Sequence, residues 1–252
     1  SRPLLFPDIS YSFYPVWCKL YEVPYRTVPL TEDFRVDVDA YTGDNGGILI
    51  PNPNAPTGVL LPLEKIERLL ANNPDSVVVI DEAYIDFGGT SATTLIGQYD
   101  NLLVIQTASK SRSLAGLRVG VAFGSVDLID GLVRVKDSFN SYPMDVVAQQ
   151  AALASLADES WFLNGCQQVM DTRERVSERM RAMGFDVLPS AANFIFSRHP
   201  AHSAEALFCA LRDRGIIVRY FDKPRISEFL RISIGTDEAM NMLLNALEEI
   251  LD

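Results

Sequence analysis

The stretch Val77-Val78-Val79-Ile80-Asp81-Glu82-Ala83-Tyr84 is a short run of branched apolar residues followed at once by two carboxylates. A run this short that is apolar on both faces is typical of a strand buried inside a parallel sheet. Three similar runs occupy residues 47–50, 102–105 and 119–122, and an apolar helical stripe occupies residues 62–72. Because strands alternate with helices here, the sequence predicts an α/β fold with a mostly parallel sheet flanked by helices.

The pattern changes after about residue 140, where two helices precede a mixture of short strands and helices. This mixture predicts a smaller α+β domain that follows the first. We therefore expect a large domain over residues 1–158 and a small C-terminal domain over residues 159–252. The predicted helices of this half cover 145–156, 160–183, 203–214 and 237–251, and the predicted strands cover 186–188, 194–197, 216–219 and 229–234.

Composition narrows the class of protein. With 252 residues and 48% hydrophobic content, the chain can bury a large core. Its net charge of −11 disfavours nucleic acid as a partner, because such binders need a basic face. No apolar run approaches the ~20 residues that a membrane helix needs. Three widely spaced cysteines indicate neither a metal site nor a disulfide framework, so we expect reduced thiols in the cytoplasm.

Polar groups follow the predicted strands at the edge where ligands of open α/β sheets bind. Taken alone, an aspartate after a strand is usually a cap and a lysine is usually solvated. Together they fit pyridoxal phosphate, which needs an amine for its aldehyde, a carboxylate for its ring nitrogen, and donors for its phenolic oxygen and phosphate. These polar groups belong to residues 51–58, residues 81–84, Ser109-Lys110 and Arg118.

The motifs Asn-Pro-x-x-Pro-Thr-Gly, Asp-x-x-Tyr and Ser-Lys followed by Gly-x-Arg stand in an order that resembles the fold-type-I aminotransferases. Within that superfamily the amino-acid sequence of the chain resembles histidinol-phosphate aminotransferase, over essentially all 252 residues. The stretches that carry this resemblance are residues 81–87, 113–120, 189–194, 215–219 and 230–236.

The resemblance assigns a role to each matching residue around the cofactor. It implies that Lys110 forms the Schiff base and moves the proton during catalysis. Asp81 would pair with the pyridinium nitrogen, and Tyr84 would donate to the phenolic oxygen. Ser109 and Arg118 would hold the phosphate, together with residues that family members carry ahead of the point where this chain begins.

Four further residues match less specific positions. Tyr11 matches an aromatic residue that stacks on the cofactor ring, although a core aromatic that opens the helix 14–20 is an equally good interpretation. Arg231 would bind the substrate α-carboxylate through its planar fork. Arg219 matches the position that meets the substrate phosphate, with a solvated strand-end charge as the alternative. Asn193 would be a substrate or hinge contact.

The chain departs from the family at one position. Family members usually have an asparagine directly before Pro-Thr-Gly, where this chain has Ala55 preceded by Asn54. Either Asn54 takes over the contact with the phenolic oxygen or Tyr84 serves alone. The two histidines, His199 and His202, lie near a predicted strand end, and we expect them to be a solvated loop pair rather than catalytic.

The resemblance implies a cytoplasmic homodimer that transfers an amino group between L-histidinol phosphate and 2-oxoglutarate in histidine biosynthesis. Threonine-phosphate decarboxylase, or another aminotransferase of the same superfamily, is the alternative with shared motifs. A non-catalytic fragment without cofactor is the alternative from another class. The start at Ser1 indicates a chain cut from a longer one, so weak or absent cofactor is expected for these 252 residues.

Overall fold

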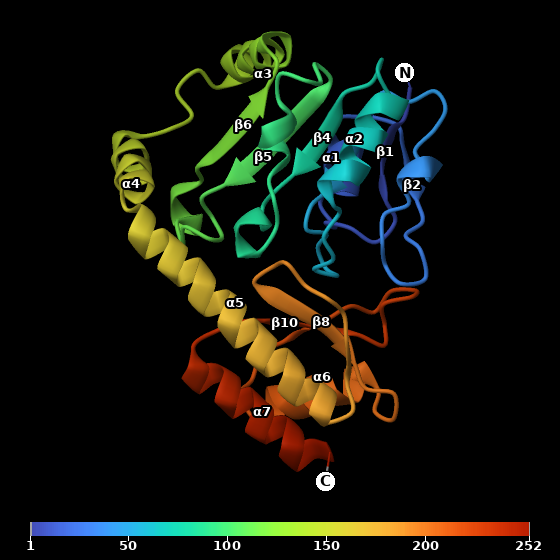
Figure 1. Ribbon diagram of the computed structural model, residues 1–252, viewed down its shortest axis with the longest axis vertical. Helices are drawn as coiled ribbons and strands as arrows, with labels where there is room; N and C mark the ends of the chain where they lie inside the picture. The colour runs from blue at the N-terminus through green and yellow to red at the C-terminus, as the bar shows by residue number, and fades with distance from the viewer. Residues whose placement is uncertain (1, 252) are drawn as a thin grey trace.

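The computed structural model describes residues 2–251 and contains two β-sheets, one above the other in Figure 1. The larger sheet has six strands in the order β2-β1-β3-β4-β5-β6. Neighbouring strands in it are parallel except for β5 and β6, which are antiparallel. Its strands are β1 (Leu4–Pro7), β2 (Tyr25–Val28), β3 (Gly47–Pro51), β4 (Val78–Asp81), β5 (Leu102–Thr107) and β6 (Gly120–Gly124).

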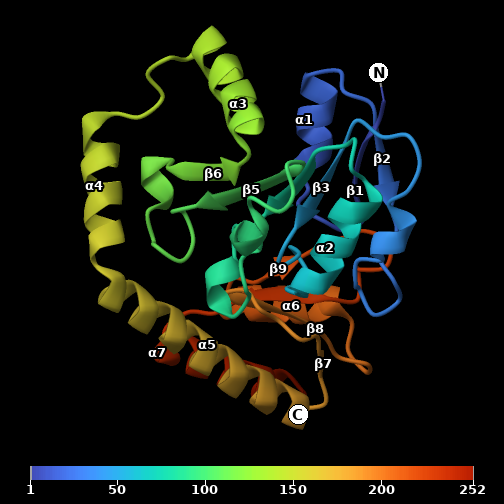
Figure 2. The same cartoon turned by 45° about the horizontal axis from the view of Figure 1, so that its top comes forward.

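Helices cover both faces of this sheet. Figure 2 shows α1 (Tyr14–Leu20) and α2 (Leu63–Asn72) on opposite sides of the strands. Ile48 of β3 packs in one core cluster with the apolar stripe of α2, whereas its neighbour Leu49 packs with α1. Alternate residues of a strand point to opposite faces, so both faces of β3 are apolar. The predicted α/β class, a mostly parallel sheet flanked by helices, is confirmed.

The same alternation orients the polar side chains at the end of β4. Ile80 lies in the core beneath α2, so Asp81, the next residue, lies on the face of α1. Glu82 returns to the opposite face, where it is buried and accepts hydrogen bonds from Ser91 Oγ at 2.6 Å and Gln106 Nε2 at 2.8 Å. Because Gln106 lies on β5, Glu82 ties together the ends of the two strands that carry the candidate site.

The smaller sheet has four antiparallel strands in the order β7-β8-β10-β9. Its core is shared with three helices, of which the long α5 runs from the upper layer of Figure 1 to the lower one. The proposed domain boundary after residue 158 falls at the start of α5 and stays a prediction. The elements are β7 (Asp186–Val187), β8 (Phe194–Arg198), β9 (Arg219–Tyr220), β10 (Leu230–Ser233), α5 (Glu159–Ala182), α6 (Ala204–Asp213) and α7 (Asp237–Leu251).

Some elements differ from the predictions. The patterns do not predict β1, β2 or α3 (Val126–Phe139), and β9 begins at Arg219 instead of residue 216. No residue of α3 is fully buried, although its apolar residues Leu128 and Ile129 are partly buried. Within residues 2–251, none of the helices is both long and apolar enough to cross a membrane. The remaining elements are α4 (Val146–Ala157) and the short 3₁₀ helices η1 (Val38–Ala40), η2 (Ile85–Phe87), η3 (Ala92–Leu95) and η4 (Ala115–Leu117).

Candidate active site

A cavity of about 410 Å³ lies at the carboxyl ends of β3, β4 and β5. These strand ends point toward the layer of the smaller sheet in Figure 1. The volume falls in the range of small-molecule sites, roughly 300–1,000 Å³. The cavity brings together six of the ten predicted site residues, and they are Tyr11, Asp81, Tyr84, Ser109, Lys110 and Arg118.

Asp81 is the carboxylate of this cavity. Its Oδ2 accepts a hydrogen bond from the hydroxyl of Tyr14 at 2.7 Å, and its Oδ1 accepts one from the backbone N–H of Ala83 at 3.2 Å. Burial raises the pKa of Asp81, while these two donors and the charge of Lys110 act in the opposite direction. Within residues 2–251 no cation forms an ion pair with Asp81 at 4 Å or less. The carboxylate therefore faces the cavity with acceptor capacity to spare.

Lys110 supplies the amine. It lies in a turn just after β5, and its Nζ is 5.4 Å from the centre of the Tyr84 ring. That ring packs edge-on against Phe194 of the smaller sheet, with 5.1 Å between centroids. Tyr84 thus fills the space between the amine and the neighbouring layer. Because Lys110 is exposed while its neighbours Asp81 and Tyr84 are partly buried, its amine can reach a molecule that enters from solvent.

Ser109 and Arg118 line the same cavity from the loop that connects β5 and β6. Arg118 has a left-handed backbone with φ +55°, and its guanidinium donates to the backbone oxygen of Ala115 at 2.8 Å. Four of the five guanidinium N–H groups are not used by that bond. A hydroxyl and a guanidinium side by side suit an anion, and their contact with a cofactor phosphate stays a prediction.

A second cavity, of about 490 Å³, shares Tyr11 and Ala55 with the first and is lined on its other side by Arg219 and Arg231. The two arginines are partners in the register of β9 and β10. Arg231 is partly buried, and its Nε has no hydrogen-bond partner within residues 2–251. Burial and the nearby charge of Arg219 lower the pKa of Arg231, while Tyr84 raises it. An anion would satisfy both arginines.

Two predicted residues lie outside both cavities. Asn54 is buried, and its amide donates to Ile9 O at 3.0 Å and to Thr57 Oγ1 at 2.9 Å, so it joins its own loop to the segment after β1. Ala55 takes the lining position instead, because consecutive side chains of the loop point in different directions. Asn193 precedes β8, and its backbone oxygen accepts from the N–H of Ile234 at 2.9 Å. The structure thus gives both asparagines contacts within the protein.

Of the two roles considered for Tyr11, the structure gives the contact with the cavities to Tyr11 and the place in the core to Tyr14. Tyr11 is 44% exposed and lines both cavities, as a residue that contacts a ligand would. Tyr14 is 1% exposed and is the core aromatic that opens α1. The bond from Tyr14 to Asp81 is not predicted by the sequence patterns. The available signal was that Tyr14 follows three residues after Tyr11, the residue predicted to face the cofactor.

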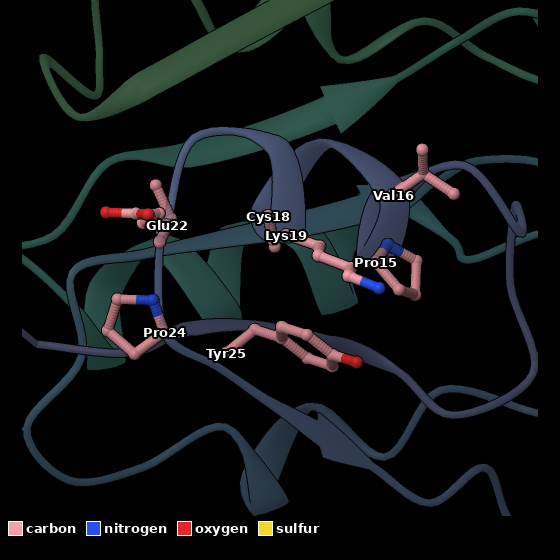
Figure 3. A pocket seen from close by; sticks show the side chains of 8 residues that line it. Pro15, Val16, Cys18, Lys19, Glu22, Pro24 and Tyr25 are labelled. Atoms are coloured by element: carbon pink, nitrogen blue, oxygen red, sulfur yellow. The ribbon is translucent and has the colours of Figure 1, made fainter.

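A larger hollow of about 790 Å³ lies elsewhere, between α1 and β2. Figure 3 shows Lys19 on α1 and Glu22 after it, with Pro24 and Tyr25 forming the opposite wall. None of the predicted site residues lines this hollow. In the part of the chain that the structure describes, no cluster of three or more His, Cys, Asp or Glu residues could hold a metal ion. The chemistry is therefore gathered in the first two cavities.

Comparison with known proteins agrees with this geometry. The family described as aminotransferase class I and II matches residues 1–247. Histidinol-phosphate aminotransferase 1 of Bordetella parapertussis is 58% identical over 253 aligned positions, which cover 99% of this chain and 71% of that protein.

Two solved structures share the fold. Histidinol-phosphate aminotransferase from Clostridium acetobutylicum superposes with a TM-score of 0.93 at 25% identity, over 99% of this chain and 78% of that one. The Sinorhizobium meliloti enzyme of the same name, solved in complex with pyridoxal-5'-phosphate, superposes with a TM-score of 0.88 at 24% identity, over 100% of this chain and 71% of that one. With the family matched over nearly its whole length, and with the amine and carboxylate of its fold brought to one cavity, the chain belongs to the class I and II aminotransferases, which depend on pyridoxal phosphate.

Proposed function

We propose that this aminotransferase transfers the amino group of L-histidinol phosphate to 2-oxoglutarate, as a step of histidine biosynthesis. The observation that carries the proposal is the pair of joined cavities. One contains the amine of Lys110 and the carboxylate of Asp81, and the other contains two arginines without anionic partners within residues 2–251. The relative from Bordetella parapertussis, with its 58% identity, supports this choice of substrate.

The residues of the first cavity fit pyridoxal phosphate. Asp81 is a partly buried carboxylate that forms no ion pair within residues 2–251, and a protonated ring nitrogen would supply the missing cation. Lys110 would hold the cofactor through its amine, Tyr84 would donate to its phenolic oxygen, and Ser109 and Arg118 would hold its phosphate. When bound, the cofactor supplies an aldehyde that reacts with amines and a ring that withdraws electrons.

The side chains of the protein then divide the remaining work. Lys110, exposed beside the Tyr84 ring, would take a proton from the α-carbon of the amino donor and later return one to the keto acid. Asp81 must remain ionised to do its task, and its two hydrogen-bond donors favour that form. Tyr11, on the shared wall, would cover the face of the cofactor and separate it from the second cavity.

The second cavity must accept two different anions. 2-Oxoglutarate has an α-carboxylate, whereas L-histidinol phosphate is the phosphate ester of an amino alcohol and has no carboxylate. The prediction that Arg231 binds an α-carboxylate therefore applies to the keto acid and its product. For the amino donor we propose that the fork of Arg231 meets the phosphate, with Arg219 beside it, because a guanidinium binds either anion through two bonds.

We further propose a cytoplasmic homodimer with the two domains divided after residue 158. Exposed apolar side chains on α3 and α4, such as Phe139 at 78% and Val146 at 71%, support an association surface there. Light scattering on the purified chain measures its mass, and a monomer at all concentrations would contradict the dimer.

The test of the proposed function is a substrate comparison. The chain, saturated with pyridoxal phosphate, is given L-histidinol phosphate with 2-oxoglutarate, and glutamate formation is followed. Threonine phosphate is given in a parallel reaction in which release of carbon dioxide is followed. Glutamate formation that disappears in Lys110→Ala supports the proposal. Carbon dioxide release without glutamate formation would favour the decarboxylase alternative, and inactivity with both, together with no bound cofactor, would favour the non-catalytic one.

A further inference from the structure

Tyr14 is the only side chain in residues 2–251 that donates a hydrogen bond to Asp81. The distance from the Tyr14 hydroxyl to Asp81 Oδ2 is 2.7 Å, typical of a charge-assisted bond. Tyr14 itself is 1% exposed and does not line the cavity, whereas Asp81 does. The tyrosine therefore holds the carboxylate from behind, from α1, while the cavity side of Asp81 stays open to a ligand.

The surroundings keep Tyr14 a donor. Burial, followed by the charge of Asp81 and its hydrogen bond, raises the pKa of Tyr14 far above neutrality, so the hydroxyl retains its proton. The ring is fixed by Phe6, edge-on at 5.7 Å, and by Tyr11, edge-on at 5.5 Å. A donor whose position and protonation are both fixed can favour one form of its acceptor throughout the working pH range.

We propose that Tyr14 is a positioning residue that orients the Asp81 carboxylate toward the cofactor ring and keeps it ionised. This inference rests on the proposed role of Asp81 opposite the ring nitrogen. The charged and titratable groups that line the cavity with Asp81 or contact it are Tyr14 on α1, Tyr11 before it, Tyr84 after β4, and Lys110 and Arg118 after β5. Of these, only Tyr14 combines burial with a direct bond to the carboxylate.

The alternative is that Tyr14 only fills the core between Phe6 and Cys18. Tyr14→Phe separates the two ideas, because it keeps the ring and removes the hydroxyl. The chain offers a matched control in Tyr41, which is also 1% exposed and whose hydroxyl has no hydrogen-bond partner within residues 2–251. Tyr41 packs in the core on the opposite face, so Tyr41→Phe removes a buried hydroxyl that does not touch Asp81.

The first measurement needs no cofactor. Chains labelled with ¹³C at the aspartate carboxyl carbons are titrated by NMR, and the Asp81 signal is assigned by its loss in Asp81→Asn. Losing a hydrogen bond to a charged group should raise the proton affinity of Asp81 about tenfold in Tyr14→Phe and leave it unchanged in Tyr41→Phe. A more acidic phenol, 3-fluorotyrosine placed at position 14, should lower that affinity relative to the natural chain.

The second measurement uses the enzyme loaded with cofactor. Tyr14→Phe should lower kcat about tenfold and change KM for either substrate by less than about twofold, because the bond acts on the charge opposite the ring and not on substrate binding. An Asp81 titration in Tyr14→Phe that matches the natural chain would overturn the proposal, whatever the activity. A shifted titration in an inactive protein would preserve the contact and would instead count against the proposed function.

Discussion

Asp81 of the first cavity and Arg231 of the second differ in how far the rest of the protein satisfies them. In the first cavity, which would hold the cofactor, both oxygens of Asp81 already accept hydrogen bonds from the protein. In the second cavity, Arg231 has a buried Nε without a hydrogen-bond partner in residues 2–251. Arg219 beside it has no ion pair within the same residues. A group held in place is prepared for chemistry, whereas a buried unsatisfied donor is prepared for a ligand. The first cavity should therefore govern kcat, and the second should govern KM.

The largest effect should come from the amine of the first cavity. Lys110→Ala should lower kcat on the order of 10⁴-fold, because no other amine of residues 2–251 lines that cavity to move the proton. Lys110 is exposed, so the midpoint of thermal unfolding should stay the same. Initial rates of glutamate formation, with circular dichroism as the control for folding, measure both. Turnover within about tenfold of the natural chain would show that another group moves the proton.

Asp81→Asn should reduce kcat about 10²- to 10³-fold while KM changes little. The amide keeps the shape but cannot carry the charge opposite the ring nitrogen. The pH profile gives an independent check. Because burial raises the pKa of Asp81 before the cofactor binds, the ionised form that would pair with the ring nitrogen is lost as pH falls through that raised value, so cofactor affinity of the natural chain should fall on the acid side. If the acid limb remained unchanged in Asp81→Asn, that limb would belong to another group.

Ionisation of Asp81, which function needs, should lower the free energy of unfolding. The pKa of Asp81 is higher in the folded chain than in the unfolded one, so ionisation of Asp81 costs stability as pH rises from the unfolded to the folded value. Asp81→Asn removes that cost. The free energy of unfolding should therefore decrease less between acidic and neutral pH in the variant than in the natural chain. Urea unfolding at several pH values measures this difference, and equal slopes would show that the carboxylate is not destabilised by burial.

The second cavity should respond through KM. Arg231→Lys should raise KM for both 2-oxoglutarate and L-histidinol phosphate about 10- to 100-fold with a small change in kcat, because a lysine replaces a two-pronged contact with either anion by a single one. Arg219→Ala should raise KM for the phosphorylated donor by a smaller factor, about fivefold, since Arg219 is exposed to solvent. Initial-rate kinetics with each substrate varied in turn separate the two. Identical patterns in both variants would remove the distinction between the arginines.

Asn54 should matter least for activity. Asn54→Ala should destabilise the chain by about 1–3 kcal/mol, because Ile9 O and Thr57 Oγ1 lose a buried donor. The kcat of the folded fraction should stay within about twofold of the natural value, since the amide does not line the cofactor cavity. Chemical unfolding and activity measurements on the same preparation test this. A large loss of kcat without loss of stability would return Asn54 to the site.

The sequence predicts those helices and strands whose burial leaves a local pattern of apolar residues. The strands that carry Asp81 and Lys110 are short apolar runs in sequence, and their parallel alignment brings the two residues to one edge of the sheet. By contrast, β2 at the sheet edge buries only its last residue, and α3 has no fully buried residue although its apolar side chains recur at helical spacing. The chain reverses from β5 to β6 without a covering helix, which makes β6 antiparallel.

The contacts that sequence patterns miss are those that depend on the direction of one side chain. Asn54 and Ala55 are neighbours, and only the folded loop decides which of them lines the cavities. The bond from Tyr14 to Asp81 spans 67 positions and depends on which face of β4 the aspartate takes. Side chains alternate along β4, so Ile80 and Asp81 point to opposite faces of the sheet. Which of these faces carries α1 is known only once α1 and α2 have been placed.

The most direct test of the account is to find where the cofactor attaches. The chain is incubated with excess pyridoxal phosphate, reduced with borohydride and digested, and the modified peptide is identified by mass spectrometry. We expect a single cofactor on Lys110, beside Tyr84 in the cavity that Asp81 also lines, and no labelling at that peptide in Lys110→Ala. Attachment to a different lysine of the chain in preference to Lys110 would contradict the assignment of the cavity.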